Sequence, residues 1–469
     1  MRVMLINPPA IEAYGKYKAA AKAGATPQAP LGVCYIAAQL EKHGHDVRLI
    51  DADIEGYGPD EISQEIKDFK PEVLGITATT PIYPTANKIF SLAKEIDKSL
   101  VTILGGFHIT ALPMRTMKES TADFGLFGEA EETIVELLDC IKEGKEPSGV
   151  KGILFRKGKE IMMNPLREQI QNLDALPFPA LHLLKHDKYL WSVPGKGTVP
   201  VAAITTQRGC PFQCIFCGVQ TMFKGIRYRS IPNVVDEIEH RVNELGIKHF
   251  YIQDDTMTMN KAKMLDMCRE IKKRKLEVTW EGYTRANTIT PELLQVMKDA
   301  GLVRLSFGVE SGNDKVLKAI KKGIKKEDMV KAYEMCHAAG IETRGSFMLG
   351  HPFETKETIK ETIDFAKSLK MYQAYINITT PYPGSELYTL AKEGYGGITL
   401  LTDDWQEFRR YGNAVMEMND LTKDDLIKLQ KKAYRQFYLR PHIIWYNIRR
   451  AGLRAAWQNG VAFFKSVLR

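Results

Sequence analysis

Hydrophobic runs and amphipathic stretches alternate through the first 145 residues. The runs are short and almost wholly apolar, as the buried strands of a parallel sheet are, and the stretches between them carry apolar residues at helical spacing. This alternation predicts an α/β fold with a doubly wound parallel sheet over residues 1–145, and ligands of such sheets bind at the carboxyl ends of the strands. The five predicted strands are RVMLIN, DVRLIDAD, EVLGITATT, LVTILGG and FGLFG.

A second alternating region covers residues 201–390. Its six strand-like runs, separated by helix-like ones, predict a partial (β/α)6 barrel that is open on one side, with active-site residues at the carboxyl ends of the strands. Residues 146–200 predict a connector with a β-hairpin that turns at Lys157 and Gly158, and residues 391–469 a small helical region. The six runs are VPVAAITT, KHFYIQDD, LEVTWEGYT, LVRLSFGVE, ETRGSFMLG and QAYINITT.

Length and composition are those of an ordinary enzyme. The 469 residues suffice for two to three domains, and the net charge of +8 is too modest to favour a nucleic-acid partner. No apolar run reaches the length of a transmembrane helix, and the opening MRVMLINPPA is unlike a signal peptide. Because the seven cysteines suggest no disulfide framework, we expect a cytoplasmic protein.

Three of these cysteines, Cys210, Cys214 and Cys217, lie close together in TTQRGCPFQCIFCGV. Three thiolates at this spacing can bind three irons of a [4Fe–4S] cluster and leave the fourth iron open to a small molecule. Cys268 and Cys336 fall in helix-like segments and supply no fourth ligand. The alternatives are a zinc site, which would need a fourth ligand and often a second Cys-x2-Cys pair, and three buried structural cysteines. The spacing favours the cluster, with these cysteines as its metal ligands and catalytic residues.

The triplet, with Phe216 before its third cysteine, resembles the signature of radical S-adenosylmethionine (SAM) enzymes. The resemblance extends over about residues 200–390, where YIQDDTMTMN, GYTRAN, LSFGVESG, GSFMLGHPFET and TPYPGSELY follow in the order of that superfamily. It implies that SAM binds the open iron and that an electron splits SAM into methionine and a 5′-deoxyadenosyl radical. An external reductant of the flavodoxin or ferredoxin type would supply the electron, and the protein would supply position and a dry pocket.

Contacts to SAM are implied at the carboxyl ends of the barrel strands. A carboxylate suits the ammonium group of SAM, and an arginine can form paired bonds with its carboxylate. For each residue, the alternative is a salt bridge that closes the top of the barrel. The implied contacts are Gln253, Asp254 and Asp255 to the amino group, Arg285 and Arg344 to the carboxylate, Glu310 and Ser311 to the ribose or amino acid, and Gly345, Met348 and Gly350 near the adenine.

The first region lacks the G-x-G-x-x-G of a dinucleotide site. Its order of NPP, PLGVCYIAAQLEKHGHDVRLID, GGFH and FGEAEET instead resembles the cobalamin-binding domain that precedes many radical SAM barrels. The alternatives are that the small residues only end strands tightly, that the histidine of GGFH is structural, and that the domain has lost cobalamin. The implied cobalamin contacts are Pro8, Thr77, Thr79, Gly105, Gly106, His108, Gly128 and Glu129.

One departure concerns the lower face of cobalamin. Cobalamin proteins that coordinate this face with histidine carry Asp-x-His-x-x-Gly after the first strand, whereas the loop here reads NPPAIEAYGKYK. We therefore expect a lower axial position without histidine.

The tail mixes aromatic and basic residues. This composition suits a helix on an anionic membrane surface, or a helix that covers the open side of the barrel with a solvated basic face. Its FYLRP segment resembles cobalamin-type radical SAM proteins of the magnesium-protoporphyrin monomethyl ester cyclase-like and hopanoid methylase-like groups, whose substrates are large and apolar. The predicted apolar face consists of Tyr434, Phe437, Tyr438, Ile443, Ile444 and Trp445.

Three functions are compatible with these patterns. The first is cobalamin-dependent methylation of an unactivated carbon on a lipid, tetrapyrrole or natural product. The second is a radical cyclisation, oxidation or C–C bond formation without methyl transfer. The third is a non-catalytic cobalamin or iron–sulfur sensor, which the intact barrel motifs disfavour. We expect a cytoplasmic location, with peripheral association at the inner membrane surface.

Overall fold

The first sheet of the protein has seven strands in the order β2-β1-β3-β4-β5-β6-β7. The computed structural model describes residues 1–10 and 27–449. Strands β1 to β5 run parallel, as the alternating pattern predicts, and the β6–β7 hairpin continues the sheet in antiparallel register. The strands are β1 (Arg2–Asn7), β2 (Asp46–Asp51), β3 (Val73–Thr77), β4 (Val101–Gly105), β5 (Phe124–Leu126), β6 (Ile153–Lys157) and β7 (Glu160–Met163).

Helices cover both faces of this sheet. Alternate side chains of β1 enter opposite cores: Val3 and Leu5 pack with α2 and α8, whereas Met4 and Ile6 pack with α4 and α5. Burial on both faces explains why the strands have apolar runs without alternation. The helices are α2 (Leu31–Lys42), α3 (Ala52–Glu55), α4 (Pro59–Phe69), α5 (Tyr83–Ile96), α6 (Phe107–Ala111), α7 (Pro113–Glu119) and α8 (Glu131–Lys142).

The second sheet has the order β16-β15-β14-β13-β12-β9-β8. Six of its strands are parallel, and β8 pairs with β9 in antiparallel register at one edge. Among the described residues no ladder joins β16 to β8, so the barrel is partial, as predicted. The strands are β8 (Leu190–Val193), β9 (Gly197–Ile204), β12 (His249–Ile252), β13 (Thr279–Thr284), β14 (Leu302–Glu310), β15 (Glu342–Leu349) and β16 (Gln373–Ile378).

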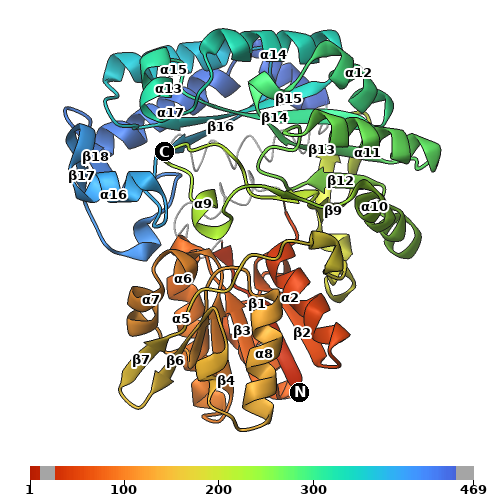
Figure 1. The fold of residues 1–469 in the computed structure, drawn as a ribbon. Coiled ribbons are helices and arrows are strands. Elements are labelled where there is room, and N and C mark those ends of the chain that lie inside the picture. The colour runs from red at the N-terminus through yellow and green to blue at the C-terminus, as the bar shows by residue number, and fades with distance from the viewer. Residues whose placement is uncertain (11–26, 450–469) are drawn as a thin grey trace.

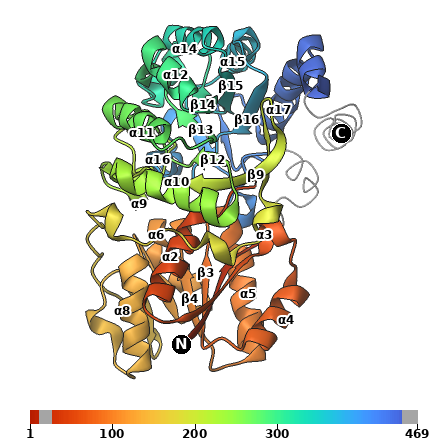
Figure 2. The same cartoon turned by 90° about the vertical axis from the view of Figure 1, so that its right-hand side faces the viewer.

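Helices pack on the outer side of this curled sheet (Figures 1 and 2). Sequence signals define their ends: α10 begins after Ser230, whose side chain accepts from the backbone N–H of Asn233, and ends at Gly246 in the left-handed conformation. The helices are α10 (Ile231–Leu245), α11 (Lys261–Lys273), α12 (Pro291–Asp299), α13 (Asp314–Ala319), α14 (Lys326–Ala338), α15 (Lys356–Ser368) and α16 (Glu386–Lys392).

The connector is an ordered strap between the two sheets. Ala180 donates a backbone hydrogen bond to Cys34 on α2, and the hydroxyl of Tyr189 donates to Asp51 at the end of β2. Trp191 on β8 is buried in an apolar core that runs without interruption from the first sheet into the barrel. The two domains therefore share one hydrophobic core, with the small helix α9 (Val219–Met222) between them (Figure 1).

The region after residue 391 covers the edge of the barrel. It contains a small antiparallel pair, β17 (Ile398–Leu400) and β18 (Met416–Met418), besides the helix α17 (Lys423–Tyr438), so it is not wholly helical. Helix α17 lies along β16 (Figure 2). The hydroxyls of Tyr434 and Tyr438 accept from backbone N–H groups of this edge strand, and Gln430 donates to one of its carbonyls.

These bonds satisfy the edge of a sheet that would otherwise be open. Of the predicted apolar face, Tyr434, Phe437 and Ile443 are buried and Tyr438 is half-buried, whereas Ile444 and Trp445 are exposed. No helix among the described residues has the length and apolar character needed to cross a bilayer.

Candidate active site between the two sheets

The predicted cysteines lie in a loop that a short β-ladder closes at its base. Strands β10 (Gln207–Arg208) and β11 (Arg227–Tyr228) pair in antiparallel register on either side of residues 209–226, which we call the cluster loop. Gly209 has φ +90°, and a Cβ there would lie 2.1 Å from the carbonyl oxygen of Gly225. The close approach of the two ends of the loop therefore requires glycine.

The three cysteines are free thiols in a partly desolvated site. Cys210 is buried, Cys214 and Cys217 are half-buried, and the backbone N–H of Cys217 donates to the carbonyl of Cys214 at 3.0 Å. Burial raises the pKa of Cys210 and raises that of Cys217 to about 11, with further contributions from Asp255 and the neighbouring cysteines. Metal binding would therefore release protons from these thiols.

The donor set fits an iron–sulfur cluster. In the described part of the chain, no three His, Cys, Asp or Glu side chains converge closely enough to hold a single metal ion. A cubane differs from a single ion because each thiolate binds a separate iron, so the sulfurs need not converge on one point. Three soft ligands on one loop match this arrangement.

Arg285 lies beside the cluster loop, just after β13. Its guanidinium lies 3.9 Å from the Sγ of Cys214 and 3.7 Å from the ring centroid of Phe212. The side chain is buried, and its Nε has no hydrogen-bond partner among the described residues. A buried cation with an unused donor suits an anionic group in the site, so the geometry agrees with the predicted contact to the SAM carboxylate.

The two adjacent aspartates after β12 have different environments. Asp254 is buried and accepts hydrogen bonds from the backbone and hydroxyl of Thr206 and from the backbone of Gln207. Burial raises its pKa to about 7, against the opposing effect of these hydrogen bonds. Asp255 is exposed, and desolvation by its surroundings raises its pKa. Asp254 therefore holds the start of the cluster loop, and Asp255 is the carboxylate that remains accessible. The side chain of Gln253 is also exposed.

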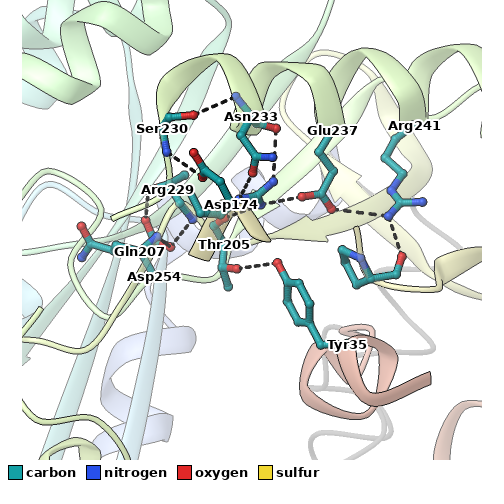
Figure 3. A network of polar contacts seen from close by, with 12 residues as sticks. Tyr35, Asp174, Thr205, Gln207, Arg229, Ser230, Asn233, Glu237, Arg241 and Asp254 are labelled. Atoms are coloured by element: carbon teal, nitrogen blue, oxygen red, sulfur yellow. Dashed lines mark hydrogen bonds and ion pairs between the residues drawn. The ribbon is translucent and has the colours of Figure 1, made fainter. Parts of the chain in front are cut away.

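Polar contacts extend this support to the first domain (Figure 3). Arg229, which follows β11, pairs with Glu237 on α10 and donates to the carbonyl of Thr205. The hydroxyl of Thr205 in turn lies 3.2 Å from that of Tyr35 on α2. The strand that leads into the cluster loop is thus held by both domains.

Glu310 and Ser311, at the end of β14, point to different surroundings. Glu310 has φ +65° at a register shift between β14 and β15, and its carboxylate pairs with Lys322 at 2.9 Å in a buried site. Lys322 also lies 6.0 Å from the ring of Phe216 in the cluster loop. Left-handed backbone at a non-glycine residue is costly and often occurs at functional sites. Ser311 instead bonds Thr362 on α15, behind the sheet.

Arg344 and Gly345 have partners away from the cluster loop, and their contact with SAM stays a prediction. Arg344 is the third residue of β15, near the amino end of the strand, and pairs with Glu281 at 3.5 Å inside the barrel. A Cβ on Gly345 would contact Tyr333 of α14 at 2.8 Å, so this glycine faces the outer helices. Met348 is half-buried nearer the carboxyl end, and Gly350 packs against Leu426 of α17.

Small residues lie at the carboxyl ends of strands in the first sheet, and we call those around Gly105 and Gly106 the cradle. Gly105 has open space at its Cβ position, whereas a Cβ on Gly106 would lie 2.7 Å from the hydroxyl of Thr77. Gly106 has φ +100°, so glycine is required for this close approach of the loops after β3 and β4. Thr79 is exposed beside them, and Pro8 is buried after β1. The bare backbone at Gly105 fits the close approach of a planar corrin.

Two predicted cobalamin contacts have other partners. His108 is buried, stacks on Tyr83 at 4.5 Å and lies 5.0 Å from Trp405. Burial lowers its pKa to about 4, so it is a neutral structural residue beneath the C-terminal segment. The Glu129 carboxylate accepts from Arg208 and Arg227 at 2.7 Å each and from the backbone of Ile170. Both side chains are therefore engaged within the protein, and their contact with cobalamin stays a prediction. Gly128 has φ +81° and packs against Leu166.

The cradle and the cluster loop touch each other. A Cβ on Gly218, directly after Cys217, would lie 2.2 Å from the Cζ of Phe107, which follows the two cradle glycines. Helices α6 and α9 pack together at this point. The two candidate cofactor sites are consequently neighbours in space, although about 100 residues separate them in the sequence.

Sequence reasoning missed several residues of the site. Arg208 and Arg227 are buried or nearly so and pair with Glu129, which is far away in the sequence, and buried Lys322 pairs with Glu310. His351 is also buried, with its ring 5.7 Å from that of Phe216. Of these residues, the sequence could have indicated only Arg208 and Arg227, because they stand at the two ends of the loop that carries the cysteines.

Family models match both parts of the chain. The Radical SAM superfamily matches residues 204–366 and the B12 binding domain matches residues 18–138. An uncharacterized methyltransferase of Pyrococcus horikoshii is 35% identical over 95% of this chain and 94% of that protein. The anaerobic magnesium-protoporphyrin IX monomethyl ester cyclase of Rubrivivax gelatinosus is 28% identical over 99% of this chain and 83% of that protein. The resemblance predicted from the motifs is confirmed.

A solved structure has the same fold. The radical S-adenosylmethionine methyltransferase TsrM from Kitasatospora setae, with cobalamin and a [4Fe-4S] cluster bound, superposes with a TM-score of 0.70. The alignment covers 94% of this chain and 89% of that chain at 17% identity. At this identity the likeness establishes the architecture, and the predicted fold class is confirmed.

Proposed function

The chain belongs to the radical SAM superfamily and carries a B12-binding domain, and we propose that it methylates an unactivated carbon in a cobalamin-dependent radical reaction. It is a radical SAM enzyme whose cofactors are a [4Fe–4S] cluster, SAM and cobalamin. When bound, the cluster and SAM supply a 5′-deoxyadenosyl radical, and cobalamin supplies the methyl group. The single observation that carries the proposal is the contact between Gly218 and Phe107, because methyl transfer requires both cofactors to face one substrate.

The protein would hold these groups with few side chains. Cys210, Cys214 and Cys217 would bind the cluster. Arg285, with its unused Nε, would bind the SAM carboxylate, and exposed Asp255 would bind its ammonium group. The cradle at Gly105 and Gly106 would receive the corrin, supported by Thr77, Thr79 and Pro8.

Residues of β15 and of the ends of β12 and β14 would complete the site. Gln253 is exposed two residues before Asp255, and Met348 lies on the inward-facing register of β15, so both would complete the SAM pocket. The buried pair of Glu310 and Lys322 would reach SAM from the opposite side of Phe216. We do not include Arg344, Gly345, Ser311, Gly350, His108, Gly128 or Glu129 among the cofactor contacts, because each is engaged elsewhere.

Product analysis tests the reaction. Anaerobically reconstituted protein with SAM, cobalamin and a reductant should form both 5′-deoxyadenosine and S-adenosylhomocysteine. Cys214→Ala should form no 5′-deoxyadenosine, because the cluster that splits SAM is lost, whereas Cys268→Ala, a buried cysteine on α11, should retain both products. Formation of 5′-deoxyadenosine without S-adenosylhomocysteine would exclude methyl transfer and favour a radical cyclase or oxidase. The likeness to the cyclase of Rubrivivax gelatinosus, which extends over 99% of this chain, makes this the second candidate.

The relatives of this chain act on chemically different substrates. The named relatives include a bacteriochlorophyllide d methyltransferase of Chlorobaculum tepidum and a cytidylyl-2-hydroxyethylphosphonate methyltransferase of Streptomyces wedmorensis, so apolar and polar substrates both occur. An apolar substrate agrees with the exposed Ile444 and Trp445 after α17, which would contact a membrane surface. Binding of the full chain to anionic vesicles at low salt tests this point, and Trp445→Ser with unchanged vesicle binding would contradict it.

A further inference from the structure

The base of the cluster loop carries two arginines that face each other. Arg208 on β10 lies two residues before Cys210, and its register partner across the ladder is Arg227 on β11. Like charges directly opposite each other on paired strands are destabilising. Both side chains are nearly buried, with exposed fractions of 11% and 9%. A two-residue ladder with buried like charges needs other groups to hold it closed.

Those groups come from the first domain. Glu129, in the loop after β5, accepts from Arg208 with one carboxylate oxygen and from Arg227 with the other, each at 2.7 Å. Glu131, at the start of α8, pairs with Arg208 at 2.6 Å. The side chain of Glu129 is 3% exposed, and although burial raises its pKa, hydrogen bonds from both arginines hold it below the usual value. The four charges are balanced, and one carboxylate bridges the two strands.

The same carboxylate also fixes the connector. It accepts from the backbone N–H of Ile170 at 2.9 Å, while Arg227 donates to the carbonyl of that residue. At the other end of the cysteines, Gly218 contacts Phe107 from the first sheet. The cluster loop is therefore attached to the first domain at its base and again after its last cysteine. Both attachments come from segments at the carboxyl ends of the first sheet.

We propose that Glu129 is a positioning residue, which holds the cluster loop closed at its base and at a fixed place over the strand ends of the first domain. Its carboxylate acts through the two arginines and does not itself contact a cofactor. That Glu129 thereby fixes the distance between cluster and corrin rests on the proposed function. That it holds the loop closed does not. Removal of the charge should open the ladder while both domains stay folded.

Hydrogen–deuterium exchange of the full chain tests the closure. In Glu129→Gln the amide faces both arginines without a charge, and Glu131 alone remains to balance them. Amides of residues 205–230 should then exchange at least about tenfold faster than in the wild type. Glu132→Gln is the matched control, because Glu132 on α8 is exposed and pairs with Arg167 of the connector instead of with the arginines of the loop base. Equal exchange of this segment in Glu129→Gln and the wild type would overturn the proposal.

A second variant covers the case in which Glu129→Gln unfolds. Glu129→Asp keeps the charge but is one methylene shorter, so it cannot reach both arginines at once. Faster exchange confined to residues 205–230 is expected, and exchange in this segment equal to the wild type would contradict the bridging role.

Electron paramagnetic resonance tests the positional consequence. With the cluster reduced and cobalamin in the cob(II) state, the two spins interact with a strength that falls steeply with distance. Glu129→Gln should weaken or broaden this interaction at full iron and corrin content, whereas Glu132→Gln should not. Identical interaction in all three proteins would refute the positional role. If the wild type forms no S-adenosylhomocysteine, the proposed function is wrong, but hydrogen–deuterium exchange still tests whether Glu129 holds the loop closed. Failure of the proposed function can therefore be distinguished from failure of this proposal.

Discussion

Substitution of the adjacent residues Asp254 and Asp255 should affect different properties: stability for Asp254 and SAM affinity for Asp255. The sequence assigned both to the SAM amino group, whereas in the structure Asp254 holds the start of the cluster loop and Asp255 stays accessible. Asp254→Ala removes one hydroxyl bond and leaves the backbone N–H groups of Thr206 and Gln207 without their acceptor. Each unsatisfied buried donor costs about 1–3 kcal/mol, so we expect a total loss of roughly 3 kcal/mol once water enters the space.

This loss should appear in thermal unfolding. For a domain of this size, 1 kcal/mol shifts the melting temperature by about 2–4 °C, so Asp254→Ala should lower the barrel transition by roughly 6–12 °C in scanning fluorimetry of the apoprotein. Asp255→Ala should change stability by less than about 0.5 kcal/mol, as surface substitutions do. Loss of its charge-assisted bond, about 1.5–3 kcal/mol, should raise the SAM dissociation constant about 10- to 100-fold in the reconstituted protein.

The two assays together decide the assignment. Asp254→Ala with an unchanged melting temperature and weakened SAM binding would mean that Asp254 is the ligand contact and that its hydrogen bonds contribute little. Asp255→Ala with unchanged SAM affinity would remove Asp255 from the pocket. Asp254→Asn, which keeps one acceptor oxygen for the backbone of Thr206, should lie between the wild type and the alanine variant in stability.

Further predictions concern the cysteines, the loop base and pH. Reconstituted wild type and Cys268→Ala should each carry about four irons per chain, and Cys214→Ala should lose most of them in iron assays. Gly209→Ala should also lose cluster, because its Cβ would collide with the carbonyl oxygen of Gly225; full iron content would show that the loop can relax. His249 and His351 are buried, and burial lowers the pKa of each to about 3. The unfolded chain therefore binds protons that these histidines do not bind in the native state, so each histidine should lower the stability by about 2 kcal/mol at pH 5. The raised pKa of Asp254 acts in the opposite direction over the same range. Urea unfolding of the wild type and of His351→Gln at pH 7.5 and pH 5 separates the two effects, and the same pH response in both proteins would contradict the prediction.

Local pattern was sufficient for the fold. Apolar runs such as RVMLIN predicted the buried parallel strands, because both faces of the sheet are covered by helices and the strands show no polar alternation. Strand β8 was missed, since Leu190–Val193 carries no pattern that separates it from a loop and is a strand only by pairing with β9. The edge protection by α17 was foreseen only as one of two alternatives for the tail.

The site was predictable where chemistry lies in adjacent residues and not where it depends on distant partners. The cysteine triplet and the cradle glycines are local features. Glu129 was assigned to cobalamin because its arginine partners lie 79 and 98 residues away. Arg344 was placed at the wrong end of its strand, because the motif ETRGSFMLG does not mark where the strand begins relative to Glu281.

The hydrogen bonds from α17 to β16 have a consequence during synthesis. The ribosome completes β16 at Ile378, but the tyrosines that cover its edge end at Tyr438, 60 residues later. At ordinary elongation rates, this interval lasts about 3–12 s, during which the nascent barrel presents unpaired backbone groups to other chains. Nascent chains that stall or end between these points would expose an adhesive strand, so this enzyme should depend on chaperones late in translation, and truncation before residue 423 should yield aggregates in place of a smaller soluble protein.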